Sequence, residues 1–180
     1  MHISFAEYSL ELHEWQSKHQ MISSLEDCEA GSCVLGENPD QESNFYSVVV
    51  HLGQSGLRRY GIGICSQGHG LVPHLLIQPE FLRLILGFNS DIVGIRIPDG
   101  RVDFSLHLDS LFYSFLPVYN KKVILVMHES GVVSLTQNGQ MIWKFEKDII
   151  TRTTIEENYL WLTFMDALPV RLNLLNGAIE

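Results

Sequence analysis

The stretch Val133-Ser134-Leu135-Thr136-Gln137-Asn138-Gly139-Gln140-Met141-Ile142-Trp143 decides the fold of this 180-residue chain. It contains a short apolar strand, an Asn-Gly pair and a second strand that ends on tryptophan. Asn-Gly between two strands is a strong hairpin signal, because both residues tolerate the positive φ angles of a tight turn. The stretch therefore predicts an antiparallel hairpin.

The same pattern recurs at a spacing close to 39 residues. Gly100, Gly139 and Gly177 each follow Asp or Asn, at intervals of 39 and 38 residues. An apolar strand lies about fifteen residues before each glycine, and a valine stands seven residues before it. The strands are residues 82–86, 123–126 and 160–164, and the valines are Val93, Val132 and Val170. A repeat of this length with about four short strands is the period of a propeller blade.

Further strands extend each copy of the repeat. Residues 102–108 alternate between apolar and polar side chains, which is typical of a strand with one buried face. β-rich runs follow at residues 111–116 and 149–155, and residues 71–78 form a fainter earlier copy. Asp109 and Asp148 stand nine residues after their glycines. Their recurrence predicts a structural role, in which each accepts backbone N–H groups at a corner between strands.

The strand, Gly turn and Trp-bearing strand resemble the blades of quinone-cofactor propellers, over residues 80–180 at most. Because 180 residues allow fewer than five such blades, the expected fold is mainly β, with antiparallel meanders in an incomplete propeller-like array or a curled β-sandwich. A closed four-blade body and a generic antiparallel meander remain alternatives. We expect one domain over residues 1–180, with an irregular acidic N-terminal segment at 1–44 and a β-rich body at 45–180.

Within the N-terminal segment, the stripe of apolar residues from Phe5 to Trp15 fits a helix or a strand equally well. Residues 21–25 fit a short helix or an edge strand. Residues 26–42 contain two glycines and a proline, so we expect a loop there.

Negative charge is concentrated in this segment. The whole chain has 12 Lys and Arg against 21 Asp and Glu, for a net charge of −9, which argues against binding to nucleic acid or an anionic membrane. Residues 1–44 hold nine of the acids and a single base, Lys18. Clustered like charge suits the steering of a cationic partner. The alternative is a solvated acidic segment that aids solubility.

No sequence motif identifies a catalytic centre, and no cofactor is expected. Cys65, His69 and His74 have a spacing that permits a zinc site, and so a metal-assisted hydrolase is one alternative. A scaffold or sugar-binding module with Tyr159 and Trp161 as a stacking platform is another. His51 lies in an apolar strand and is expected to be a core residue with satisfied hydrogen bonds.

A small, acidic, single-domain chain without a catalytic motif, whose negative charge is concentrated in one segment, resembles bacterial immunity proteins from contact-dependent and other polymorphic toxin systems. The resemblance implies a cytoplasmic, non-enzymatic protein that binds and neutralises a basic toxin, a nuclease in many such systems. It transfers no motif residue by residue. The start of the chain has no basic region followed by an apolar run, which fits a cytoplasmic location. The residues expected to bind the partner are Trp15, Glu26, Asp27, Glu29, Glu37, Asp40 and Glu42.

Overall fold

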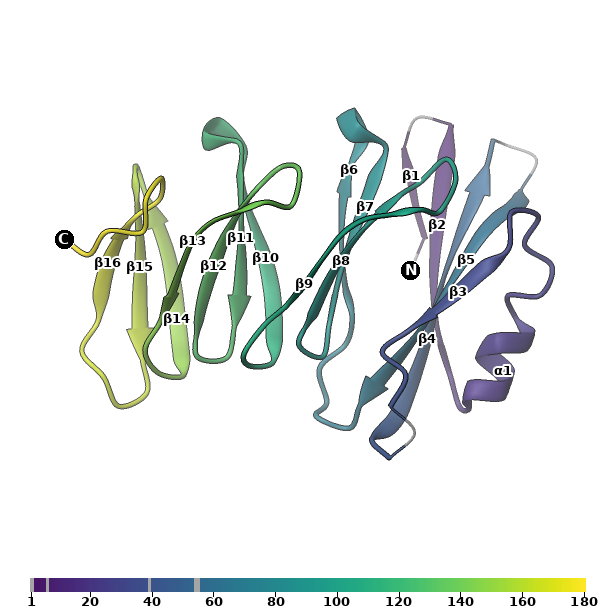
Figure 1. The fold of residues 1–180 in the computed structure, drawn as a ribbon, viewed down its shortest axis with the longest axis horizontal. Coiled ribbons are helices and arrows are strands. Elements are labelled where there is room, and N and C mark those ends of the chain that lie inside the picture. Colours follow the sequence, from purple (N-terminus) through teal and green to yellow (C-terminus); the bar gives the residue numbers. More distant parts are fainter. Residues whose placement is uncertain (1, 6, 39, 54–55) are drawn as a thin grey trace. The chain divides into compact units, whose positions relative to one another are not determined.

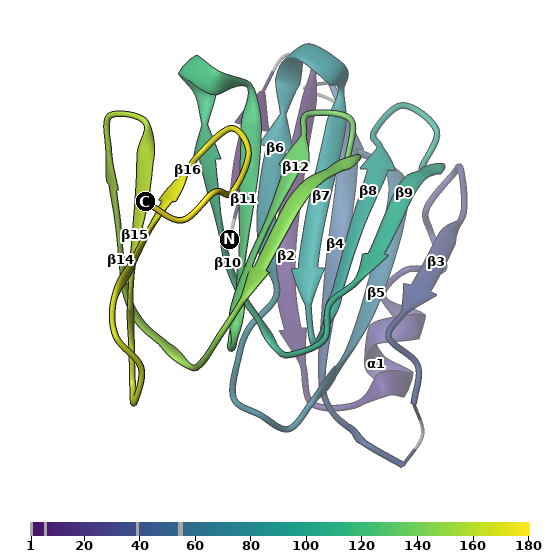
Figure 2. The same ribbon diagram turned by 60° about the vertical axis from the view of Figure 1, so that its left-hand side comes forward.

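The computed structural model describes residues 2–5, 7–38, 40–53 and 56–180 (Figures 1 and 2). The chain is mainly β and forms four sheets. Its contacts divide it into two compact units, Met1–Ser105 and Leu106–Glu180, and the division falls inside strand β9 (Val102–His107). The expectation of a single domain remains a prediction.

The first sheet of unit 1 has five strands in the order β1-β2-β4-β5-β3. Neighbouring strands are antiparallel except for the edge strand β3, which runs parallel to β5. The strands are β1 (His2–Phe5), β2 (Tyr8–Trp15), β3 (Ser32–Leu35), β4 (Glu42–Leu52) and β5 (Leu57–Gln67).

The first 44 residues are more regular than the sequence suggested. The stripe up to Trp15 forms strands β1 and β2, and β3 lies inside the segment expected to be a loop. The short helix α1 (Lys18–Ser23) is capped by the Ser17 hydroxyl, which accepts the Gln20 N–H at 3.3 Å. Met21 and Leu25 are buried against Gly63 and Gly61 of β5, so this segment covers part of the outer face of the sheet. The sequence of β2 fits a helix or a strand equally well, so tertiary packing decides that it forms a strand.

The second sheet of unit 1 is a four-stranded meander in the order β6-β7-β8-β9. Its further strands are β6 (His74–Gln78), β7 (Arg83–Phe88) and β8 (Asp91–Arg96), with a helical turn, η1 (Pro79–Phe81), between β6 and β7. Leu84, Leu86 and Ile95 of this sheet share one hydrophobic core with Val48 and Ile62 of the five-stranded sheet. The inner face of the five-stranded sheet is thus buried, and its outer face is left for α1 and polar side chains.

Unit 2 repeats the meander twice. One sheet contains β10 (Phe112–Val118), β11 (Val123–His128), β12 (Gly131–Thr136) and β13 (Met141–Glu146), with η2 (Tyr119–Lys121) after β10. The other contains β14 (Ile150–Glu156), β15 (Tyr159–Phe164) and β16 (Val170–Asn173). Gly100, Gly139 and Gly177 have φ angles of 68°, 78° and 70°, so the turn prediction is confirmed at all three positions. The fold is an incomplete propeller-like array, as the repeat predicted.

The tryptophan of the repeat connects one meander of unit 2 to the next. Trp143 is buried, and its indole N–H donates to the Leu174 carbonyl at 3.0 Å. A Cβ atom at Gly177 would lie 2.8 Å from the Trp143 ring. The glycine is therefore needed both for its positive φ and for the close approach of the indole.

The predicted corner aspartates differ in their roles. Asp148 accepts the N–H groups of Ile149 at 2.7 Å and of Asp166 at 3.0 Å. Asp109 instead forms an ion pair with Lys144 on β13. The predicted acceptance of backbone N–H groups is confirmed for Asp148. For Asp109 the structure shows an ion pair with a lysine from the next copy of the repeat, so its acceptance of backbone N–H groups stays a prediction.

Candidate functional site

The acidic residues predicted to bind a partner do not form one cluster. They fall into two groups at opposite ends of β3, which spans roughly 13 Å at about 3.3 Å per residue. Because β3 runs parallel to β5, the residues before β3 lie where β5 begins and the residues after it lie where β5 ends. The first group is Glu26, Asp27 and Glu29, and the second is Glu37, Asp40 and Glu42.

The second group is largely occupied within the chain. The Lys18 ammonium lies 3.0 Å from a carboxylate oxygen of both Glu37 and Glu42, and these hydrogen bonds raise the pKa of Lys18 above its ordinary value. The Glu42 side chain is only 9% exposed and also accepts the Asn38 N–H at 3.0 Å. Asp40 is exposed. Glu42 therefore stabilises the start of β4 and offers little surface to a partner.

The first group points its charge into solvent. Glu26 and Asp27 are exposed in the turn after α1, and within the described ranges no ion pair involves either of them. Glu29 lies 3.7 Å from the Arg59 guanidinium, and both side chains are well exposed. Such a pair is worth little free energy, so it leaves Glu29 able to change partners.

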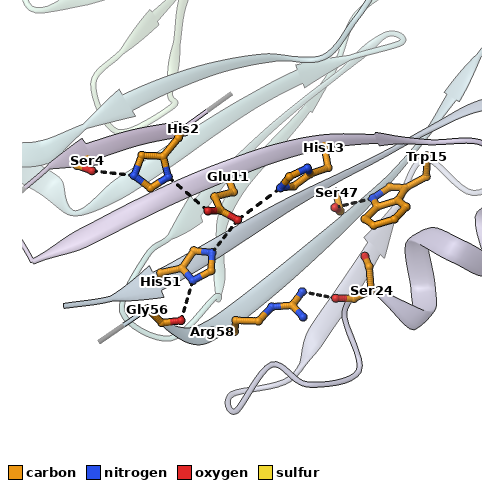
Figure 3. A network of polar contacts seen from close by, with 10 residues as sticks. All are labelled: His2, Ser4, Glu11, His13, Trp15, Ser24, Ser47, His51, Gly56 and Arg58. Atoms are coloured by element: carbon orange, nitrogen blue, oxygen red, sulfur yellow. Dashed lines mark hydrogen bonds and ion pairs between the residues drawn. The ribbon is translucent and has the colours of Figure 1, made fainter. Parts of the chain in front are cut away.

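Trp15 ends β2 on the outer face of the five-stranded sheet. Its indole N–H donates to the Ser47 hydroxyl at 2.8 Å, which fixes the ring on that face (Figure 3). The ring lines an open hollow of about 640 Å³ together with Glu14 and with Ser23 and Ser24 at the end of α1. The hollow therefore ends two residues before Glu26 along the chain, and none of the first group of carboxylates lines it.

A second polar cluster, which the sequence did not single out, lies on the same face. Ser9, Glu11, His13 and Trp15 alternate along β2 and point outward, because Tyr8 and Leu10 between them are in the core. The Glu11 carboxylate is ringed by three imidazoles, from His2 of β1 at 3.5 Å, His13 at 3.4 Å and His51 of β4 at 3.3 Å (Figure 3). In the sequence, only the interpretation of residues 5–15 as a strand could have indicated this cluster. A helix would place these side chains on different faces.

His51 departs from the expectation of a satisfied core residue. It is buried, with 9% exposure, and its Nδ1 donates to the Gly56 carbonyl at 3.1 Å. Its Nε2 is also buried but has no hydrogen bond among the described residues. The prediction that His51 is buried is correct. The prediction that its hydrogen bonds are satisfied is wrong, because Nε2, within the residues that the structure describes, faces the Glu11 carboxylate without a hydrogen bond.

The charge on Glu11 follows from this setting. Burial alone would raise the pKa of Glu11, but the hydrogen bond from His13 and the positive charges that His51 and His13 can carry outweigh it. The pKa of Glu11 therefore lies below its ordinary value of 4.5, and the carboxylate is ionised at neutral pH. A groove of about 730 Å³ opens over Glu11 and His51 and is lined as well by His2, Ser4, Glu7 and Ser9. We call it the Glu11 groove.

The residues of the zinc alternative are engaged elsewhere. Cys65 is buried, and this burial raises its pKa to about 11, so the thiolate form that binds metal is disfavoured. His69 donates from Nε2 to the side-chain oxygen of Asn89 at 3.1 Å. Burial lowers the pKa of His74. In the described part of the chain, no three His, Cys, Asp or Glu side chains are arranged to hold a metal ion. The hydrolase alternative gains no support.

The aromatic residues of the sugar-binding alternative are covered by a cation. Trp161 and Tyr159 lie on the outer face of the β14–β16 sheet. The Arg171 guanidinium sits 4.4 Å from the centre of the Tyr159 ring and 5.5 Å from that of Trp161. It also lies 3.3 Å from Glu180. A sugar would have to displace this guanidinium before it could stack on the rings.

Comparisons with known proteins support the fold alone. No protein-family model and no curated protein matches the chain. Among solved structures it is similar to BamB from Moraxella catarrhalis, with a TM-score of 0.54, 17% identity, and coverage of 74% of this chain and 42% of that chain. A computationally designed protein, Ika4, matches with a TM-score of 0.48 and 15% identity over 64% of this chain and 74% of its own. This chain thus spans less than half of BamB. No helix in the described residues is long and apolar enough to cross a membrane.

Proposed function

We propose that this chain is a non-enzymatic, cytoplasmic immunity protein that binds and neutralises a basic toxin, a nuclease, through the outer face of its five-stranded sheet. The observation that carries the proposal is the combination of exposed, unpaired carboxylates at Glu26 and Asp27, just after α1, with a hollow lined by Trp15 and by Ser24 at the end of α1. These residues form the primary contact surface. Glu29 adds to it after release from Arg59, and Glu37 and Asp40 form a secondary contact.

The physical basis is a complementary pair of surfaces. A nuclease holds the phosphate backbone with Lys and Arg side chains, so its active-site face is positively charged. Carboxylates that face solvent attract such a surface over about 8 Å at physiological salt and accelerate encounter. Aromatic side chains in partly enclosed hollows supply much of the binding free energy once the surfaces meet. The acidic group steers the toxin, and Trp15 anchors it.

The first test is the neighbouring gene, which the proposal expects to encode a basic toxin; the purified toxin domain then serves as the partner. We expect the Glu26→Lys, Asp27→Lys double variant to slow association with that toxin by at least about tenfold at low salt and by much less at high salt, since screening removes the long-range attraction. Stopped-flow tryptophan fluorescence measures the rate. A matched control reverses two exposed carboxylates elsewhere, Glu80→Lys with Glu156→Lys, and should change the rate less than about twofold.

Two results would contradict the proposal. One is a nuclease whose activity persists in the presence of a molar excess of the wild-type chain. The other is an association rate that responds equally to both pairs of charge reversals, because net charge rather than the surface around α1 would then control the encounter.

A further inference from the structure

The Glu11 groove contains two hydrogen-bond acceptors that face one another. The Gly56 carbonyl can only accept, so the hydrogen bond at 3.1 Å requires the proton of neutral His51 to be on Nδ1. In this neutral form the buried Nε2 carries a lone pair and lies 3.3 Å from an oxygen of the ionised Glu11 carboxylate, whereas a protonated His51 would donate to that oxygen. Two acceptors at this distance repel one another unless a donor or a cation joins them.

Three kinds of occupant satisfy two such acceptors: a proton on His51, a metal ion, or an organic cation with N–H donors. A proton on His51 would join these two atoms but would leave the volume of the groove and its other acceptors unused. A metal ion needs three or more converging ligands, and the described side chains offer no such group. The groove of about 730 Å³ is far larger than a metal site and presents further acceptors on Ser4, Ser9 and Glu7. These features favour an organic cation.

We propose that the Glu11 groove is a binding subsite for a guanidinium group, namely an arginine side chain of the basic partner. Guanidinium has five N–H donors in a rigid plane, so it can bridge Glu11 and His51 and still reach a hydroxyl of the groove wall. The identity of the occupant as a partner arginine rests on the proposed function, whereas the preference for guanidinium rests on the groove alone.

The subsite is sensitive to pH because protons compete with the guanidinium. The charged and titratable groups that face Glu11 are His2 from β1, Glu7 before β2, His13 from β2, His51 from β4 and Arg58 from β5. Arg58 is directed to the Ser24 carbonyl (Figure 3). Protonated imidazoles would surround the carboxylate with positive charge and donate to it, so protons and a guanidinium compete for Glu11.

The test is an NMR titration of the histidine side chains of the full chain with N-acetyl-arginine amide, which has no charge besides its guanidinium. At pH 8 we expect saturable shifts of the His51 and His13 resonances. N-acetyl-citrulline amide, which has the same shape without the charge, should give none. At pH 5.5 the arginine compound should lose at least about tenfold in affinity, as it should in the Glu11→Gln variant at pH 8. Glu180→Gln, which alters a carboxylate on the β14–β16 sheet, should leave the titration unchanged.

Absence of a saturable shift at pH 8, or equal shifts with citrulline, would overturn the subsite. Zn²⁺ shifts without arginine shifts would replace it by a metal site. The amide spectrum of Glu11→Gln shows whether that variant is folded, and the wild-type pH comparison tests the subsite independently of any variant. A chain that binds the arginine compound and no basic toxin would overturn the proposed function alone, and the reverse result would overturn only the subsite.

Discussion

Two sheets of this protein have an outer face with polar side chains, and they use it differently. On the β14–β16 sheet, Arg171 stacks on two aromatic rings and pairs with Glu180, so the central groups of that face satisfy one another. On the five-stranded sheet, the Glu11 carboxylate faces a histidine nitrogen that lacks a hydrogen bond, and Trp15 lines an open hollow. Both faces contain a tryptophan, an acid and basic groups.

The difference shows that exposed aromatic and charged residues do not by themselves mark a binding surface. A buried polar group without a partner costs about 1–3 kcal/mol, so a chain that retains one gives up stability that simple substitutions would restore. In the five-stranded sheet, His51 Nε2 is such a group, without a hydrogen bond to any described residue. In the β14–β16 sheet, similar residue types have partners for their polar groups. The unsatisfied face is the better candidate for function.

On the outer face of the β14–β16 sheet the polar groups have their partners within the chain. We therefore expect the stability of this sheet to depend on its buried side, where Trp143 contacts Gly177. We expect Gly177→Ala to lower the free energy of unfolding by about 3 kcal/mol, since it adds a Cβ at positive φ and pushes against the indole. Gly70→Ala is the control, because Gly70 has a φ of 79° with open space around its Cα. It should cost only about 1 kcal/mol. Equal losses in urea denaturation would show that the Trp143 contact contributes nothing.

Trp15 and Trp161, which lie on the two outer faces, provide a direct test of which face binds. Trp15→Ala should weaken toxin binding by about 2 kcal/mol, roughly 30-fold, because it removes the aromatic wall of the hollow at the end of α1. Trp161→Ala should change the affinity less than about twofold. Isothermal titration calorimetry measures both. Trp15→Phe, which keeps a ring but loses the hydrogen bond to Ser47, separates packing from that bond. A larger loss of affinity in Trp161→Ala than in Trp15→Ala would indicate that the toxin binds the β14–β16 sheet and not the five-stranded sheet.

The same chemical change should have opposite signs on the two faces. At pH 8, Glu11→Gln places an amide N–H donor opposite His51 Nε2 and should raise the free energy of unfolding by up to about 1 kcal/mol. Glu180→Gln removes an exposed ion pair with Arg171 and should lower it by at most about 0.5 kcal/mol. Urea denaturation of both variants gives the comparison.

The pH dependence of Glu11→Gln tests the carboxylate itself. The pKa of Glu11 is lowered in the folded chain, so its ionised form contributes stability above its ordinary value of 4.5, and this contribution is lost as the pH falls through the folded value. The variant lacks this group, so wild type should lose stability relative to Glu11→Gln as the pH falls below 4.5. Urea denaturation over a series of pH values measures the difference, and a difference that stays constant would show that the fold does not stabilise the ionised carboxylate.

Much of the fold followed from local patterns. The Asp-Gly and Asn-Gly turns fixed the positions of hairpins, since these signals depend only on nearby residues. Alternation in β9 correctly placed Phe104 and Leu106 on the more buried face, but Val102 is exposed. The acidic segment was harder to interpret. Strand β2 could be recognised only through its pairing with β4, which is distant in sequence, while β1 pairs with β2 and β3 obtains its place from β5.

The candidate site likewise depends partly on local sequence patterns and partly on long-range strand pairing. Sequence alone determined that acids concentrate in residues 1–44, that Trp15 lies among them and that a blade-like repeat follows, because composition and periodicity are properties of the chain itself. Only the tertiary structure decided which carboxylates remain free. Lys18 folds onto Glu37 and Glu42, whereas His51, forty residues from Glu11 along the chain, is brought to that carboxylate by the pairing of β2 with β4. Whether a polar group is satisfied depends on neighbours in space, and those are set by long-range strand pairing.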